Sequence, residues 1–167
     1  YRVERIIKAT LLFSKGVSVK KGSFTLSTLR REMDGAIEFY DYSKNIDFRY
    51  DFPSDASIEG DIDLMAIVMQ NFIYNAIDAI EEWDECEEGT IEVVFREEGG
   101  YSCFYIYDSG APIENKNILF EPFKSTKTKG HGLGLSLSMQ IVKAHGGDIA
   151  LLEGRKGFLI KIVNNPN

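Results

Sequence analysis

The segment TKTKGHGLGLSLSMQIVKAHGG, residues 126–147, places three alternating glycines directly before a helix-forming sequence. Glycine lacks Cβ, so backbone amides there can approach a bound group closely. The helix that begins near Leu135 presents unpaired N–H groups and a partial positive charge at its first turn. Gly130, Gly132 and Gly134 therefore predict a phosphate-binding loop, although glycine-rich turns also precede helices that bind nothing.

The residues around this loop exclude the commonest phosphate-binding motifs. Lys124, Lys127 and Lys129 add positive charge just before the glycines, but no G-x-x-x-x-G-K-[ST] sequence occurs, so the loop is not a P-loop. Leu135 stands where a dinucleotide-binding fingerprint has its third glycine, and no predicted strand precedes the loop. The H-R-D sequence of protein kinases is absent. A less common nucleotide-binding fold remains.

The rest of the chain alternates between helical and extended patterns. We expect helices within residues 24–43, over 62–80 and after Gly134, and strands over 45–52, 90–95, 101–107, 148–153 and 157–163. The sequences REEGG and GRKG join the last four strands into two hairpins. This order predicts an α/β fold, with an open mixed β-sheet and helices packed on one face.

Composition narrows the class of protein. The net charge of −7 and the pI of about 4.9 disfavour binding to nucleic acid through overall charge. No apolar stretch approaches the roughly 20 residues that span a bilayer. Cys86 and Cys103 have neither metal-ligand nor disulfide-framework spacing, which is typical of a reducing compartment. We therefore expect a cytoplasmic domain that meets a membrane only through other regions, if at all.

A second candidate group lies in the predicted helix 62–80. Asn71, Asn75 and Asp78 fall at positions i, i+4 and i+7, so they share one helix face among mostly apolar neighbours. Oxygen ligands of this kind suit Mg²⁺, which also takes waters and phosphates as ligands. The alternative is that they are buried polar groups with partners inside the core, and the spacing alone leaves both open.

A third candidate lies in the sequence YIYDSGAPI, where a predicted strand delivers Asp108 into a turn with Gly110. An aspartate at a strand end can accept a hydrogen bond from an exocyclic amine, and a neighbouring glycine lets a flat base approach. Taken alone, an aspartate here is more simply a turn residue.

The order of these motifs resembles the ATP-binding catalytic domain of sensor histidine kinases, in the superfamily that includes gyrase, heat-shock chaperone and mismatch-repair ATPases. NFIYNA is similar to the family's N box, DSGAPI to its first glycine box, LFEPF to its F box and GHGLGLS to its second glycine box. IVKAHGG resembles the usual continuation of that last box, and the nitrogen-regulation type of kinase is the most similar. The resemblance covers roughly residues 22–163 and implies a two-layer, Bergerat-type ATP-binding fold.

The resemblance also implies roles for individual residues around Mg²⁺ and ATP. Asn75 would ligate the metal, Asn71 would assist at the metal and phosphates, and Asp108 would accept from the adenine amine, with Gly110 giving the base room. Lys127 would hold phosphate and, with Asn71 and Asn75, take part in catalysis. The further residues that the resemblance places at the nucleotide or its lid are Asp78, Phe120, Phe123, Thr126, Gly130, His131, Gly132, Leu133, Gly134 and Leu135.

The implied function is to bind Mg-ATP and donate its γ-phosphoryl group to a histidine on a dimerisation domain. Residues 1–16 resemble the end of a helix of that domain, residues 17–22 form a linker, and 23–167 form the catalytic domain. Neither His131 nor His145 lies in a phosphoacceptor sequence, so we expect the acceptor upstream of this chain. The implied partners are the chain's own dimerisation domain and a response regulator, and not nucleic acid.

Two alternatives remain. A serine/threonine kinase of the same superfamily would share the motifs. The resemblance of residues 1–16 to the end of a dimerisation helix argues against it. A nucleotide sensor or scaffold that binds ATP without transfer gains support from two departures. Pro112 replaces a glycine of the first glycine box, and Ile67 stands where many relatives have a polar residue.

Overall fold

The computed structural model describes residues 17–53, 55–113 and 134–164. The helices of that part are α2 (Leu26–Glu38), α3 (Ile62–Glu81) and α4 (Gly134–Ala144). Its strands are β1 (Ser23–Thr25), β2 (Asn45–Asp51), β3 (Ser57–Glu59), β4 (Glu88–Glu98), β5 (Tyr101–Asp108), β6 (Asp148–Leu151) and β7 (Gly157–Val163). Residues 17–22, the predicted linker, contain neither helix nor strand.

The main sheet has five strands in the order β2-β4-β5-β7-β6. Strand β2 runs parallel to β4, and the other neighbours are antiparallel, so the predicted open mixed sheet is confirmed. Strands β1 and β3 form a separate antiparallel pair. The sequence pattern does not predict β3, because three residues are too few to show alternation.

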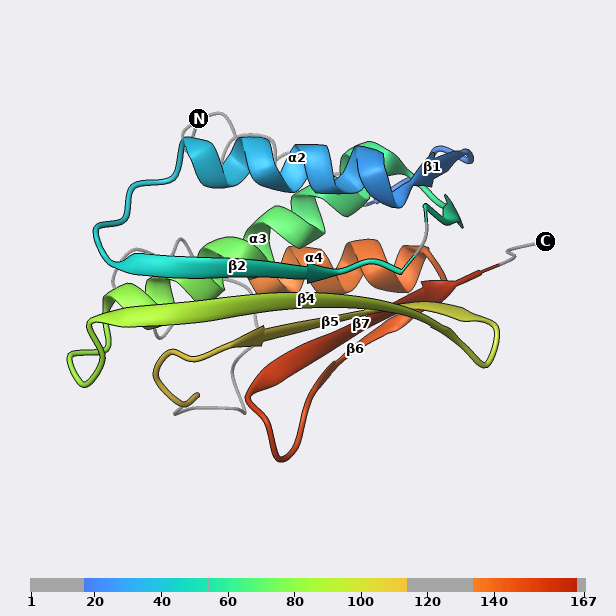
Figure 1. Ribbon diagram of the computed structural model, residues 1–167. Coiled ribbons are helices and arrows are strands. Elements are labelled where there is room, and N and C mark those ends of the chain that lie inside the picture. The colour runs from blue at the N-terminus through green and yellow to red at the C-terminus, as the bar shows by residue number, and fades with distance from the viewer. Residues whose placement is uncertain (1–16, 54, 114–133, 165–167) are drawn as a thin grey trace.

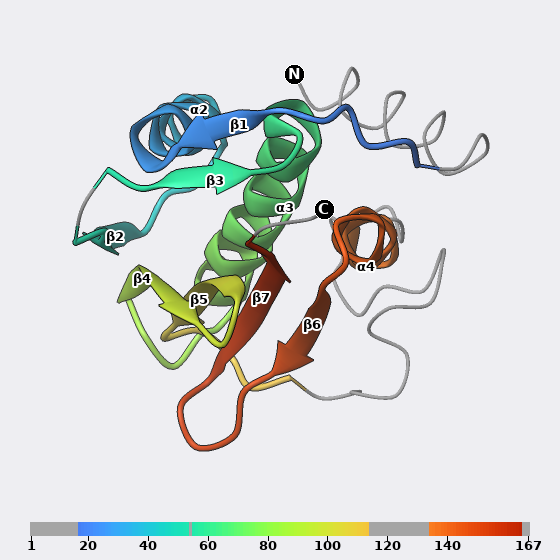
Figure 2. The ribbon, with the colours of Figure 1, turned by 90° about the vertical axis from the view of Figure 1, so that its right-hand side faces the viewer.

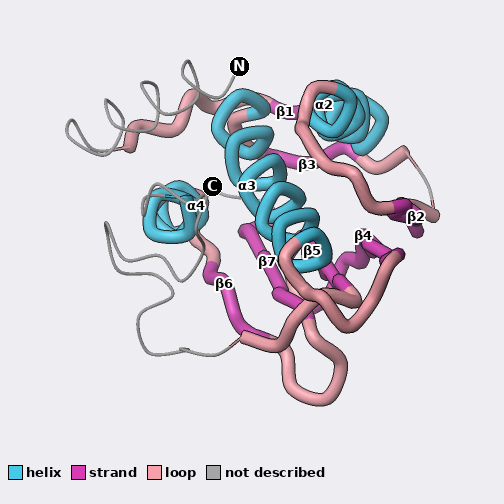
Figure 3. The backbone as a smooth tube through the Cα atoms, turned by 90° about the vertical axis from the view of Figure 1, so that its left-hand side faces the viewer, coloured by secondary structure: helices cyan, strands magenta, loops and turns pink. Residues whose placement is uncertain are grey.

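The described helices form one layer above the main sheet, as Figure 1 shows, and no helix of the described residues lies on the opposite face. Helix α3 lies between α2 and α4 and contacts β4 and β5 beneath it (Figures 2 and 3). The predicted packing of helices on one face is therefore confirmed. None of the helices in the described part of the chain combines the length and apolar composition that crossing a bilayer requires.

Helix α3 is the centre of the core because most of its residues are apolar and buried. Its N-cap is Asp61, whose side chain accepts a hydrogen bond from the Leu64 amide at 3.2 Å. Successive residues of β4, β5 and β7 point to opposite faces of the sheet. On the face that the helices cover, Ile91, Phe104 and Ile160 are fully buried. The sheet and α3 together hold the ends of β5 and β7 beneath the second half of α3.

The glycines of the AHGG sequence end α4 and start β6. Gly146 has φ of 75°, and the amides of Gly146 and Gly147 donate to the carbonyls of Lys143 and Val142 at 2.9 and 3.0 Å. A Cβ on Gly147 would lie 1.7 Å from the Lys161 carbonyl oxygen, so β7 passes too close for any side chain. These two glycines bring α4 directly onto the edge of the sheet.

Candidate functional site

A cavity of about 230 Å³ lies between the second half of α3 and the adjoining ends of β5 and β7. Most of its wall is apolar, and a few polar groups converge on it, as in many small-molecule sites. The apolar lining residues are Phe72, Ala76, Ala79, Ile106, Ala111, Pro112, Ile113, Leu135 and Phe158, and the polar ones are Asn75, Glu82, Asp108 and Lys156. Phe72 and Phe158 meet edge-on, with ring centroids 4.9 Å apart.

Asp108, the last residue of β5, reaches this cavity with its carboxylate already engaged. Its Oδ1 accepts from the Gly110 amide at 2.9 Å and from Nζ of Lys156 at 2.6 Å. The side chains of Lys156 and Asp108 are 21% and 8% exposed, so this ion pair is much less hydrated than a surface pair. The carboxylate thus lies at a strand end, as predicted. It is paired with Lys156, which the motif around Asp108 does not predict.

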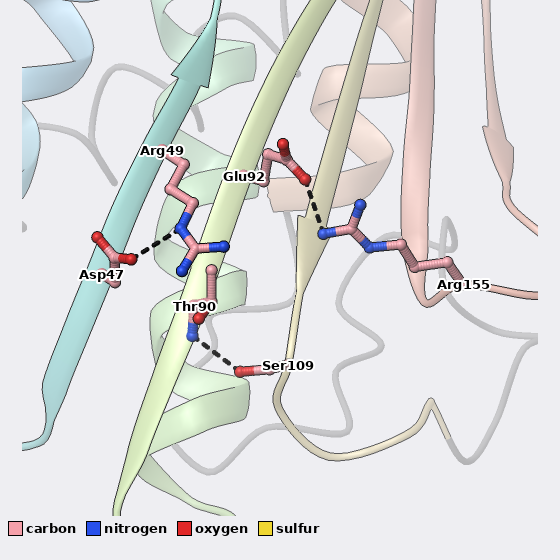
Figure 4. Close-up of polar contacts among 6 residues, drawn as sticks. All are labelled: Asp47, Arg49, Thr90, Glu92, Ser109 and Arg155. Atoms are coloured by element: carbon pink, nitrogen blue, oxygen red, sulfur yellow. Dashed lines mark hydrogen bonds and ion pairs between the residues drawn. The ribbon is translucent and has the colours of Figure 1, made fainter.

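The turn after Asp108 is anchored on both sides. The Ser109 amide donates to the Thr90 carbonyl at 3.1 Å, and the Ser109 hydroxyl accepts from the Thr90 amide at 2.9 Å (Figure 4). The next residue but one, Ala111, donates from its amide to the carbonyl of Ala79 in α3 at 3.2 Å. These bonds fix the wall of the cavity between β4 and the end of α3.

Gly110 is needed for contact with α3. A Cβ at this position would lie 2.5 Å from the carbonyl carbon of Ala79 and 2.7 Å from its Cβ, which is closer than real atoms approach. The structure thus gives this glycine a role in helix packing, beside the room for a base that the resemblance implies.

The three polar residues of α3 have different surroundings. Asn75 lines the cavity. Asn71 is 4% exposed and donates from Nδ2 to the Gly134 carbonyl at 3.3 Å and to Oγ of Ser138 at 3.4 Å, so it joins α3 to the start of α4. Asp78 is 5% exposed and accepts from the Tyr40 hydroxyl at 2.7 Å, beyond the end of α2.

Each of the three polar residues therefore contacts a different part of the fold. Asn75 lines the cavity, whereas Asp78 does not line it and accepts a hydrogen bond from Tyr40 near the end of α2. Gly134 and Leu135 begin α4, and Leu135 lines the cavity. The other predicted site residues lie outside the described residues: Phe120, Phe123, Thr126, Lys127, Gly130, His131, Gly132 and Leu133.

Sequence reasoning missed Lys156 and Glu82. Lys156 lies in the GRKG turn that it treats only as a hairpin connection, and Glu82 follows α3 in an acidic run that resembles a solvated loop. The pairing of β5 with β7 contains the information that places Lys156 beside Asp108. The register that pairs Tyr107 with Gly157 continues to place Asp108 opposite Lys156. That register requires the alignment of two strands, which hydrophobic alternation alone does not supply.

The donor set of the described residues suits a hard cation held jointly with a ligand. No cluster of three or more His, Cys, Asp or Glu residues that could hold a metal ion occurs among the residues that the structure describes. Asn75, whose side chain carries an amide oxygen, lines the cavity, and Mg²⁺ commonly takes one or two protein oxygens together with phosphate oxygens and waters. The residues present therefore fit Mg²⁺ bound with a nucleotide.

The chain is similar to known proteins over the part that contains the cavity. Residues 60–163 match the family described as histidine kinase-, DNA gyrase B-, and HSP90-like ATPases. The chain belongs to this family. The match spans α3, the turn after β5 and α4, and this ATPase domain therefore contains every described element that lines the cavity.

Among curated relatives, the sensor histidine kinase FlgS of Helicobacter pylori is 53% identical over 165 residues, which cover 98% of this chain and 43% of FlgS. The signal transduction histidine-protein kinase AtoS of Escherichia coli is 28% identical over 88% of this chain and 24% of its own length. This ATPase domain thus spans less than half the length of these curated relatives.

Solved structures agree with the fold. A nucleotide-free form of the catalytic domain of histidine kinase ThkA has a TM-score of 0.74 and 31% identity, over 88% of this chain and 99% of that one. ThkA in complex with the response regulator protein TrrA has a TM-score of 0.76 and 29% identity, over 99% of this chain and 48% of that one. The expected two-layer fold of a histidine kinase catalytic domain is confirmed.

Proposed function

We propose that this ATPase domain binds Mg-ATP and passes the γ-phosphoryl group to a histidine on the dimerisation domain of a two-component sensor kinase. The observation that carries the proposal is the convergence of Asn75, Asp108 and the first turn of α4 on one cavity. These are the N box, the first glycine box and the end of the second glycine box, which lie far apart along the chain.

Each wall of the cavity has a separate role in this proposal. The apolar surfaces of Ile106 and Phe158 suit a purine ring, and the carboxylate of Asp108 suits its exocyclic amine. The start of α4 at Gly134 directs backbone N–H groups and a partial positive charge toward phosphates. Asn71, through its bonds to Gly134 and Ser138, holds that helix start against α3.

Mg²⁺ would be held by Asn75, with Asn71 beside it, and would neutralise charge on the phosphate oxygens. The transfer itself forms a bond between a neutral imidazole nitrogen and the γ-phosphorus and breaks the bond from that phosphorus to the β–γ bridging oxygen. ADP leaves with the bridging oxygen, and the imidazole releases its proton to solvent. The contribution of this chain is mainly positioning and stabilisation of charge.

The domain organisation follows from the same proposal. Residues 23–167 form the catalytic domain, 17–22 the linker and 1–16 the end of a dimerisation helix. A response regulator would receive the phosphoryl group from the histidine, and the solved complex of ThkA with the response regulator protein TrrA supports such a partner. We place this domain in the cytoplasm, where ATP is available.

The test is incubation of the chain with γ-labelled ATP, Mg²⁺ and a separately prepared dimerisation domain of the same kinase. We expect acid-labile, base-stable label on the histidine of that domain, and no label when Asp108→Asn protein replaces the wild type at limiting ATP. Acid-stable label on serine or threonine would instead indicate the serine/threonine kinase. Tight ATP binding without any transfer would indicate the sensor or scaffold.

A further inference from the structure

We propose that Lys156 is a positioning residue for base recognition, which acts by holding the Asp108 carboxylate as the acceptor for the adenine amine. This inference rests on the proposed function, because it needs a purine nucleotide in the cavity. It concerns a residue of the β6–β7 turn that none of the motifs contains.

The first observation is that the two side chains face each other across neighbouring strands. The antiparallel register of β5 and β7 pairs Tyr107 with Gly157 and Ile106 with Phe158. One step further, Asp108 lies opposite Lys156, on the helix-covered side of the sheet, because alternate residues share a face. Both side chains line the cavity, and Nζ of Lys156 lies 2.6 Å from Oδ1 of Asp108.

The second observation is which oxygen is occupied. Among the described residues, both hydrogen bonds to the Asp108 carboxylate end on Oδ1, one from the Gly110 amide and one from Lys156. Two donors on one oxygen fix the orientation of the carboxylate and leave Oδ2 as an acceptor. A carboxylate whose side chain is 8% exposed is also poorly hydrated, and the ammonium places an opposite charge beside it.

The third observation is that Arg155, the residue next to Lys156, makes its contacts away from the cavity. Arg155 forms an ion pair with Glu92 at 2.8 Å and lies over the Tyr107 ring, with its guanidinium carbon 3.9 Å from the ring centroid. Figure 4 shows this pair on the helix-free face of the sheet. Arg155 and Lys156 of the β6–β7 turn thus lie on opposite faces of the sheet. Of these two side chains, Lys156 is the one that lines the cavity.

The inference predicts a specific change in selectivity. In Lys156→Met protein, Oδ1 keeps the Gly110 amide alone, the carboxylate is no longer fixed, and its buried charge is uncompensated. We expect ATP affinity to fall about tenfold, because a hydrogen bond to a charged group contributes on that scale. We expect the preference for ATP over purine riboside triphosphate, which lacks the 6-amino group, to fall as well.

Calorimetric titration of the chain with each nucleotide in the presence of Mg²⁺ measures this preference as a ratio of dissociation constants. Lys156→Arg, which keeps a donor and a charge, is expected to retain most of the ratio. Arg155→Met removes the same charge from the same turn on the other face and is the matched control, with a wild-type ratio expected. Thermal unfolding of each variant checks that it folds.

A double-variant comparison shows whether Lys156 acts through Asp108. In an Asp108→Asn background, Lys156→Met is expected to leave the ratio where Asp108→Asn alone puts it. An unchanged ratio in Lys156→Met, when Asp108→Asn does lower it, would overturn the inference and leave the proposed function intact. Tighter ATP binding by Lys156→Met would also overturn it, because the ammonium would then compete with the nucleotide.

Failure of the proposed function gives a different result. Wild-type protein that binds neither nucleotide, or binds both equally, would remove Asp108 from base recognition and this inference with it.

A folded Lys156→Met variant whose ratio falls while its stability equals that of Arg155→Met supports positioning over a merely structural role.

Discussion

The backbone amide of Asp61 donates a hydrogen bond to Nε2 of His145 at 3.1 Å, which joins residues 84 positions apart in the sequence. The ring proton therefore sits on Nδ1, which donates to the Ile141 carbonyl at 2.8 Å. The Asp61 carboxylate also accepts from the Lys20 amide at 2.9 Å. These three hydrogen bonds thus connect the 17–22 segment, the start of α3 and the end of α4.

We expect His145→Phe to lower the free energy of unfolding by about 1–3 kcal/mol, because it leaves the Asp61 amide without its acceptor inside the fold. Urea unfolding measures the change. The control is Lys143→Met, which removes an ion pair to Asp148 between side chains that are 58% and 50% exposed. That change is expected to cost less than about 1 kcal/mol. Equal midpoints for the two variants would contradict a structural role for the ring.

We expect Asn75→Ala to abolish the Mg²⁺ dependence of nucleotide binding, because it removes the amide oxygen at the cavity wall. Titration with ATP in Mg²⁺ and then in EDTA measures this dependence. Asn45→Ala, an exposed position in β2, serves as the control and is expected to behave as the wild type. An Asn75→Ala protein that still loses affinity in EDTA would remove Asn75 from the proposed metal site.

Two glycine substitutions are expected to have opposite signs. Gly110→Ala places a methyl group 2.5 Å from the Ala79 carbonyl carbon, so we expect a loss of about 1–3 kcal/mol, typical of overpacking. Gly35→Ala lies inside α2 with nothing within 4 Å of the added Cβ, and there we expect a gain of about 0.5–1 kcal/mol. A Gly110→Ala denaturant midpoint that does not fall would show that Gly110 does not limit the approach of α3.

The pKa of the Glu81 carboxyl gives a pH-dependent prediction. Burial would raise this pKa, but hydrogen bonds from the Ser43 and Lys44 amides at 2.6 and 2.8 Å and from the Ser43 hydroxyl outweigh it and lower the pKa below its usual 4.5. A lowered folded-state pKa stabilises the fold above 4.5, and this contribution is lost as the pH falls through the lowered value.

We therefore expect Glu81→Gln to be less stable than the wild type at neutral pH and the difference to close at acid pH. Urea midpoints measured across that range check the prediction, with the exposed Glu85→Gln as the control. A difference that stays constant with pH would show that the charge of Glu81 is not involved.

The sequence by itself determined the architecture and predicted the region of the candidate site. Alternation in β2, β4, β5 and β7 and the apolar surface of α3 were enough to predict an open mixed sheet with helices on one face, because burial imposes a period on each element. The order of four motifs indicated the ATPase family in the same way. Both predictions depend on patterns that can be read along the chain without knowing how its segments pack.

Tertiary structure decided how individual side chains are used. Asn71, Asn75 and Asp78 share one helix face, yet α4, the cavity and Tyr40 each engage a different one of them. Asp108 and Lys156 meet across 48 positions only through the pairing of β5 with β7. Periodicity shows which face of an element is covered but not which neighbour covers it, because that depends on how separate elements pack and align.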